Sequence, residues 1–121
     1  MSCDNDNHFC KMCADMGNFA PDTLKAIRDL DPCFMSTLHE MDRFMTEDGP
    51  IDKKHKRLMA LSCVCVRMCE DCVYPQAQIA KNYGATKGEI LEAVRVAVLI
   101  GGVPAWSCAK KGIAKLFNDW H

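Results

Sequence analysis

Two cysteines separated by two residues, Cys69 and Cys72, lie in the segment RMCEDCVYPQAQIAKNYG. This gap lets both sulfurs meet within one turn of the chain, so the pair can form an exchangeable disulfide or bind one metal ion. Two idle or buried thiols are the plainer alternative, because a chain with nine cysteines contains such spacings by chance. The motif therefore indicates redox or metal chemistry, and the rest of the chain must decide between them.

A second pair at the same spacing, Cys10 and Cys13, follows Cys3 and His8 near the start of the chain. Cysteines at this spacing are typical ligands of zinc and of iron-sulfur clusters. Residues 1–20 are polar and turn-rich without a helical period, so we interpret them as an arm whose thiols can equally be without function and whose histidine is solvated. The candidate ligands of a metal ion or iron-sulfur cluster are the four paired cysteines, Cys10, Cys13, Cys69 and Cys72.

Composition limits the class of protein. The 121 residues are 49% apolar, which is enough for one domain with its own core. Fifteen Lys and Arg against sixteen Asp and Glu leave no basic excess for nucleic acid or anionic lipid. The sequence shows no secretory signal and no apolar run long enough to span a bilayer. We expect a soluble cytoplasmic protein with reduced thiols and with no nucleic-acid or membrane partner.

The expected domain spans residues 21–121, and its first half is predicted to be helical. One helix is predicted to end at Leu30, and Asp31-Pro32 opens another that reaches about Thr46. We expect Cys33 to be a small buried side chain and His39 to lie on the surface. The apolar face predicted for this second helix consists of Phe34, Leu38, Met41 and Met45.

A third helix is predicted from an Asp52 cap to Met68. We interpret Cys63 as a packing residue and expect Cys65 to point toward the CEDC motif. The inner face of this helix is predicted to be Leu58, Leu61, Cys65 and Met68, continuing to Cys69 and Cys72. The basic residues, interpreted as a solvated face, are Lys53, Lys54, Lys56 and Arg57.

Pro75 predicts that the next helix starts near Tyr74, because proline is tolerated at a first helical position and disfavoured further along. The CEDC motif then lies at or just before a helix N-terminus, where free amides and the helix dipole favour a thiolate. Cys72, nearer the helix start, is the expected thiolate and Cys69 the resolving thiol. The acidic residues between them oppose the thiolate and make the pair a reductant.

The last two helices are bounded by clear signals. Gly84 ends one helix, and Thr86-x-x-Glu89 is a capping box for the helix 87–100, which is apolar nearly all round and indicates a subunit interface. Pro104 starts a final helix that reaches Asn118. On it, Cys108 is either a packing thiol or a further ligand. No strand pattern appears, so we predict an all-α single domain of about six helices.

The order of these elements resembles the carboxymuconolactone decarboxylase family, and within it the alkylhydroperoxidase D branch that carries C-x-x-C. The resemblance covers roughly residues 30–118 and depends on RLMALSCVCVRM, CEDCVYPQ, AKNYGATKGEILEAV and VLIGGVPAW. It implies an all-helical fold, assembly as trimers or hexamers, and disulfide reductase or peroxidase chemistry. Cys69 and Cys72 match the redox pair of that branch.

The chain departs from the branch at its proton relay. The resemblance implies a glutamate twelve residues before the first cysteine, a histidine just before the second, and a histidine four residues after it. This sequence has Arg57, Asp71 and Gln76 there. Arginine stays protonated and glutamine does not titrate, so neither replaces a relay base, and Asp71 is anionic.

We therefore expect an enzyme, a thiol-disulfide oxidoreductase in which Cys69 and Cys72 exchange with a disulfide-bearing protein. A ferredoxin-like or thioredoxin-like donor would supply electrons, and the protein would be a homo-oligomer. The alternative is an iron-sulfur module for electron transfer or redox sensing, with the cluster on the same cysteines. Weak alkyl hydroperoxide reduction is a lesser alternative, and a small assembly subunit with incidental cysteines is the plainest one.

Overall fold

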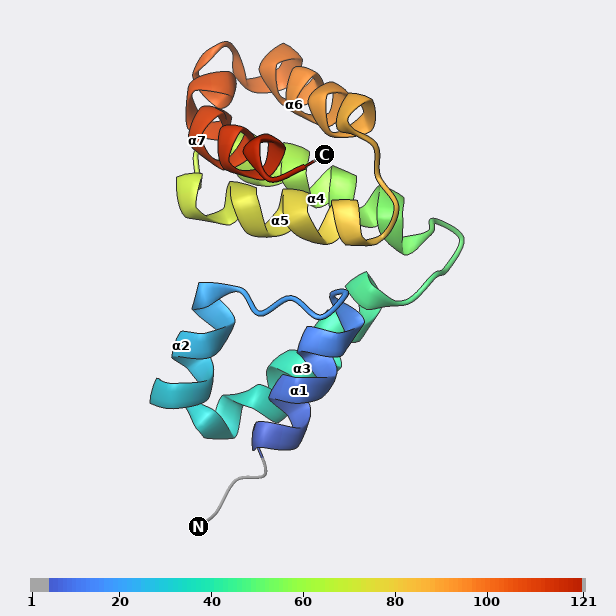
Figure 1. The fold of residues 1–121 in the computed structure, drawn as a ribbon, viewed down its shortest axis with the longest axis vertical. Helices are drawn as coiled ribbons and strands as arrows, with labels where there is room; N and C mark the ends of the chain where they lie inside the picture. The colour runs from blue at the N-terminus through green and yellow to red at the C-terminus, as the bar shows by residue number, and fades with distance from the viewer. Residues whose placement is uncertain (1–4, 121) are drawn as a thin grey trace. The chain divides into compact units, whose positions relative to one another are not determined.

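The computed structural model describes residues 5–120, and within that range it contains seven α-helices, one short 3-10 helix and no strand. The all-α prediction is confirmed. The chain divides into two compact units, the first ending at Pro50 and the second beginning at Ile51, whereas the sequence suggested a boundary near residue 20. Figure 1 shows the helices of each unit.

The first unit consists of α1 (Asn5–Asp15), α2 (Asp22–Leu30), the 3-10 turn Pro32–Phe34 and α3 (Met35–Thr46). Helix α1 contacts both α2 and α3. The arm expected over residues 1–20 is wrong for its described part, which is largely helical. Met12 and Met16, four residues apart, are buried on one face of the chain, and this apolar spacing was hidden among polar neighbours.

The predicted apolar face of α3 is wrong at Phe34 and Met41, whereas Leu38 and Met45 are half-buried. Met35 is fully buried, whereas Met41 is 65% exposed and Phe34 is 39% exposed. The α-helix starts at Met35 after the 3-10 turn, and its buried residues are Met35 and Thr46. Cys33 lies in this turn and is exposed rather than buried.

The second unit contains the four helices α4 (Lys53–Val66), α5 (Glu70–Asn82), α6 (Lys87–Gly101) and α7 (Pro104–Asn118). Helix α4 packs on α5 and α6, and α7 packs on the same two helices, so the four surround one core (Figure 1). The largest fully buried aliphatic side chains of this core are Leu61, Val73, Ile90, Val94 and Leu116. This unit provides most of the buried apolar surface.

Local signals in the sequence define the ends of these helices. Asp52 caps α4 by accepting a hydrogen bond from the His55 amide at 2.8 Å. The capping box of α6 is present, with the Glu89 amide donating to Thr86 Oγ1 at 3.1 Å and the Thr86 amide donating to the Glu89 carboxylate at 3.0 Å. Gly84 adopts φ +98°, the left-handed conformation expected after α5. These predictions are confirmed.

Helices α6 and α7 differ in how completely they are buried. Near its C-terminus α6 exposes Leu99 (83%) and Ile100 (72%), in keeping with its surplus of apolar residues. Helix α7 instead buries its small residues, and a Cβ placed on Gly112 would lie 2.9 Å from the Tyr74 amide nitrogen of α5. Glycine at this position therefore permits α7 to approach α5 closely. Among the helices described, none is both long and apolar enough to cross a membrane.

Candidate redox site

The turn between α4 and α5 brings the paired cysteines to the start of a helix. Helix α4 ends at Val66, two residues before the predicted end, because Met68 takes the left-handed conformation with φ +62°. Met68 is consequently 52% exposed instead of lining the inner face. The Cys69 amide donates to the Val64 carbonyl at 2.9 Å, which closes the turn.

Helix α5 begins at Glu70 with Cys69 as its N-cap, four residues before the start that was predicted near Tyr74. Pro75 lies inside the helix, where it removes one backbone hydrogen bond near the start. The Cys72 amide donates to the Cys69 carbonyl at 3.1 Å, and the two cysteines form a disulfide with Cα atoms 5.4 Å apart. The motif lies at the helix N-terminus as expected, although Cys69 and not Cys72 is the residue nearest that end.

The surroundings of this disulfide combine exposure on one side with acidic charge. Cys69 and Cys72 are both half-buried, while Glu70 and Asp71 between them are exposed. Lys111 Nζ of α7 lies 3.5 Å from the Glu70 carboxylate, in an exposed ion pair that solvent screens. The turn that carries the disulfide is therefore partly exposed to solvent.

Two further thiols, Cys65 of α4 and Cys108 of α7, are buried in the core of the same unit. Burial raises the pKa of Cys65 to about 11, and the neighbouring Cys108 adds to the shift. Burial and, secondarily, the negative charge of Glu70 raise the pKa of Cys108. Both are neutral packing thiols at physiological pH. Cys63, predicted to pack, is exposed because it lies on the opposite side of α4.

The basic face predicted for α4 is wrong at Arg57, whose residue is only 3% exposed. Its Nη1 donates to the side-chain oxygen of Gln76 on α5 at 3.1 Å. Sequence reasoning missed this burial, although Arg57 precedes the buried residues Leu61 and Cys65 at intervals of four, which places all three on one helix face. The other cations on this helix make surface contacts, such as Lys54 with Glu89 at 3.0 Å.

The candidate metal ligands are divided between the units. Cys10 and Cys13 lie on α1 of the first unit as free thiols, the former exposed and the latter half-buried. Burial raises the pKa of Cys13, and nearby Cys10 contributes to the shift. Cys69 and Cys72 belong to the second unit, and Cys3 lies outside the described residues. Within residues 5–120 no three His, Cys, Asp or Glu side chains converge as a metal site.

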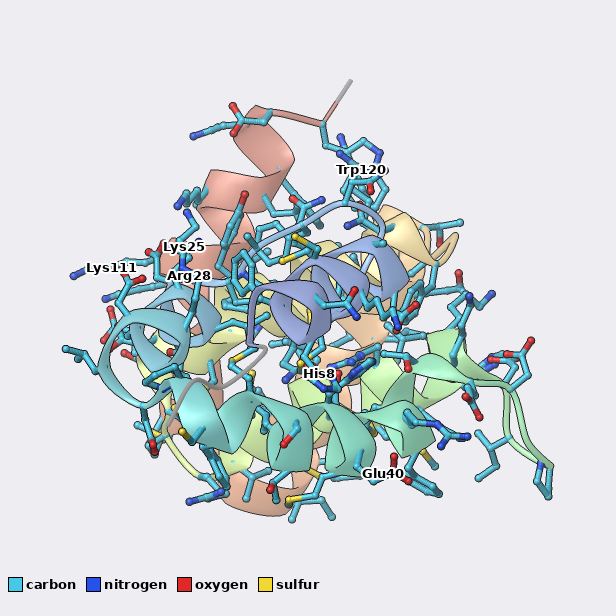
Figure 2. All side chains as sticks on the ribbon, turned by 90° about the horizontal axis from the view of Figure 1, so that it is seen from below. His8, Lys25, Arg28, Glu40, Lys111 and Trp120 are labelled. Carbon is cyan, nitrogen blue, oxygen red and sulfur yellow. A yellow bond between two sulfur atoms is a disulfide. The ribbon has the colours of Figure 1, made fainter. Side chains whose placement is uncertain are left out.

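A histidine pair in the first unit was not anticipated. The Nδ1 atoms of His8 and His39 are 2.9 Å apart, and His39 Nε2 lies 3.7 Å from an Asp15 carboxylate oxygen. Figure 2 labels His8 in the region between α1 and α3, where this contact forms. His39, expected on the surface, has a side chain only 16% exposed, because the true buried face of α3 includes it.

Comparison with known proteins gives the same fold and family. The family model described as carboxymuconolactone decarboxylase family matches residues 32–115. A protein of the cox locus of Paracoccus denitrificans is 30% identical over 95 residues, which cover 78% of this chain and 82% of that protein. An uncharacterised protein of Methanocaldococcus jannaschii is 28% identical over 99 residues, covering 81% of this chain and 95% of the other.

A solved structure adds the three-dimensional match. The crystal structure of an apo carboxymuconolactone decarboxylase family protein from Legionella pneumophila superimposes with a TM-score of 0.67. The two sequences are 25% identical, and the match covers 90% of each chain. Since the family model spans well over half of the sequence and the fold agrees, this chain belongs to the carboxymuconolactone decarboxylase family.

Proposed function

We propose that the protein is a thiol-disulfide oxidoreductase that uses Cys69 and Cys72. The observation that carries this proposal is the disulfide at the N-terminus of α5, which spans the cap and the first turn and is accessible from solvent. Free amides and the helix dipole at such an end stabilise a thiolate once the disulfide is reduced. Disulfides of this kind exchange with partner molecules instead of serving only as structural links.

The reaction consists of two exchanges. The Cys72 thiolate attacks one sulfur of a substrate disulfide, forming a mixed disulfide and releasing the other substrate sulfur as a thiolate, which takes up a proton. The Cys69 thiol loses its proton and attacks Cys72 of the mixed disulfide. This step frees the second substrate thiol and leaves the Cys69–Cys72 disulfide, so two electrons have passed to the substrate. A dithiol or ferredoxin-like donor then reduces the protein again.

Hydroperoxide reduction is a poorer match to the same site. A peroxide requires a proton for its leaving oxygen in addition to a thiolate. Two of the three relay positions hold Arg57 and Gln76, which contact each other and supply no base, and the third holds the exposed Asp71 instead of a histidine. We infer that peroxidase turnover is weak and that disulfides are the substrates.

The exposed apolar end of α6 supports a homo-oligomer as the working form. Leu99, Ile100 and Val103 are each more than 70% exposed, at 83%, 72% and 71%. Apolar side chains of this size at the end of one helix and in the following turn are typical of surfaces that pack against another chain. A trimer or hexamer would cover them. Light scattering tests the idea, and a monomer at micromolar concentration would contradict it.

An exchange assay tests the proposed function. The reduced protein is mixed with an aromatic disulfide such as dithiobis(nitrobenzoate), and the released thiolate is followed by its colour. The parent should release two thiolates per protein from the motif and return as the Cys69–Cys72 disulfide. Cys72→Ser should stop the reaction at the motif, and Cys69→Ser should trap the mixed disulfide on Cys72. Unchanged exchange in both variants would reject the oxidoreductase.

Colour and iron content distinguish the iron-sulfur alternative from disulfide exchange. Protein purified without oxygen should be colourless and low in iron if the cysteines act by exchange alone. A brown protein containing iron and sulfide would instead favour a cluster. In that case the double variant Cys10→Ser/Cys13→Ser would show whether the first unit contributes ligands, because it leaves the redox pair intact.

A further inference from the structure

The contact between Arg57 and Gln76 has a chemical consequence for the redox pair. A guanidinium has only N–H donors, so the Gln76 atom facing Arg57 Nη1 at 3.1 Å must be the amide oxygen. Once that oxygen accepts from Arg57, the two N–H donors of the Gln76 amide nitrogen point away from the guanidinium. Arg57 thereby fixes the orientation of the amide.

The fixed amide lies on the same side of α5 as Cys72. Gln76 follows Cys72 by four residues, which is the spacing of neighbours on one helix face. Side chains of an α-helix lean toward its N-terminus, so that of Gln76 leans toward the turn that holds Cys72. Donor groups directed at a sulfur favour its anionic form, because a thiolate accepts hydrogen bonds more strongly than a thiol does.

The charge of Arg57 acts in the same direction. The residue is 3% exposed, so water screens its charge less than it screens that of an exposed cation such as Lys111, whose side chain is 78% exposed. Arginine remains protonated over the whole accessible pH range. Arg57 contacts Gln76, which lies on the α5 face that carries Cys72. A permanent positive charge in this place favours a nearby anion.

We propose that Arg57, acting through Gln76, is a positioning residue that supplies a hydrogen-bond donor and positive charge to the Cys72 thiolate. In place of a base that removes the thiol proton, Arg57 and Gln76 would stabilise the Cys72 thiolate directly. This mechanism rests on the proposed disulfide exchange and gives a reason for Cys72 to be the attacking sulfur, although Cys69 lies nearer the helix end. It also defines the substrate class, because a disulfide needs a thiolate and no proton relay.

The test measures thiolate formation without using exchange activity. In a Cys69→Ser background, alkylation of Cys72 by iodoacetamide is followed against pH through the tryptic peptide 68–81, which contains no other cysteine. Arg57→Met removes the charge at similar length. Gln76→Glu keeps a partner for Arg57 but neutralises its charge and removes the N–H donors. Lys111→Met is the matched control, since it removes an exposed cation beside the same turn.

Both test variants should move the midpoint of the pH profile upward by roughly one pH unit and lower the alkylation rate at pH 7 about tenfold. Lys111→Met should move it by less than about a third of that, because exposed charges are screened. A parent-like profile in Gln76→Glu, or an equal shift in Lys111→Met, would overturn the role of Arg57. The proposed disulfide exchange is tested separately, by the activity of the parent protein in the assay with the aromatic disulfide.

Discussion

The molecule contains two cysteine pairs with the same C-x-x-C spacing in different helical settings. Cys10 and Cys13 lie in the later part of α1, beyond its first turn, and remain free thiols. Cys69 and Cys72 span the cap and first turn of α5 and form a disulfide. One pair lies within its helix, and the other lies at a helix N-terminus, where the positive end of the helix dipole is nearest.

This difference shows that the position of a C-x-x-C motif in its helix matters more than its spacing. In α1 burial raises the pKa of Cys13, which keeps it protonated. At the start of α5 the helix dipole acts in the opposite sense and favours the anion. Identical spacing therefore yields a pair of resting thiols in one unit and a candidate redox centre in the other.

The largest expected effect is an all-or-none difference in oxidation between the pairs. After incubation with oxidised glutathione, removal of the oxidant and unfolding without reductant, the tryptic peptide 68–81 should take up no maleimide. The peptide 12–25, which carries Cys13, should be labelled, because a disulfide within a regular helix distorts it. Mass spectrometry before and after dithiothreitol measures both. Equal protection of Cys13 through a bond to Cys10 would remove the distinction between the pairs.

The next effect concerns the residue four positions after each pair, Gly17 in the first unit and Gln76 in the second. Gln76→His places a titrating base beside Cys72, and general-base assistance is worth about a hundredfold or more when it is well aligned. We expect at least a tenfold gain in hydroperoxide turnover over a weak parent, measured by peroxide consumption with excess dithiol. Robust turnover by the parent would show that another residue already donates the proton.

A third effect tests how α7 supports the second pair. Gly112→Ala would place its Cβ 2.9 Å from the Tyr74 nitrogen and from Val73 Cγ1, so α7 and α5 must separate. Overpacking of this kind costs about 1–3 kcal/mol in the free energy of unfolding. Gly88→Ala is the control, because its Cβ would meet only Thr86 Oγ1 at 3.8 Å. It should be neutral or stabilise by about 0.5 kcal/mol. Urea denaturation compares the two, and equal midpoints would contradict the close approach.

The smallest effect is a pH dependence from the buried thiol of Cys65. Its folded pKa, about 11, exceeds the ordinary value of 9.0, so the folded state holds the proton longer than the unfolded state does. Stability from this residue is complete below pH 9 and is lost as pH rises toward 11. The slope is at most about 1.4 kcal/mol per pH unit.

Urea titrations at pH 8, 9 and 10 measure this slope in a Cys69→Ser/Cys72→Ser background, which prevents disulfide exchange. Cys65→Ala should flatten the dependence even though it lowers stability overall. Cys63→Ala removes an exposed thiol from the same helix and should leave the slope unchanged. A parent-like slope in Cys65→Ala would assign the effect to other groups.

The sequence allowed the helices with strong end signals to be predicted. The Thr86–Glu89 box, Gly84 and the bounds of α7 were all correct, because caps and turn residues act locally. The paired Cys69 and Cys72 were also located at a helix start, although the proline suggested a later start. Predictions failed where long-range packing decides. Met12 and Met35 are buried by neighbouring helices, and Arg57 is buried despite its charge. Composition and periodicity on one helix do not contain that information.

The disulfide between Cys69 and Cys72 closes a loop with a sequence separation of only three residues. Cross-links restrict the conformational freedom of the unfolded chain in proportion to the logarithm of loop length, so such a small ring contributes at most about 2 kcal/mol, against nearly 5 for a hundred-residue loop. Reduction should therefore lower the melting temperature by only a few degrees. We therefore expect the oxidised and reduced chains to stay folded under the same conditions, as repeated exchange at the proposed redox pair requires.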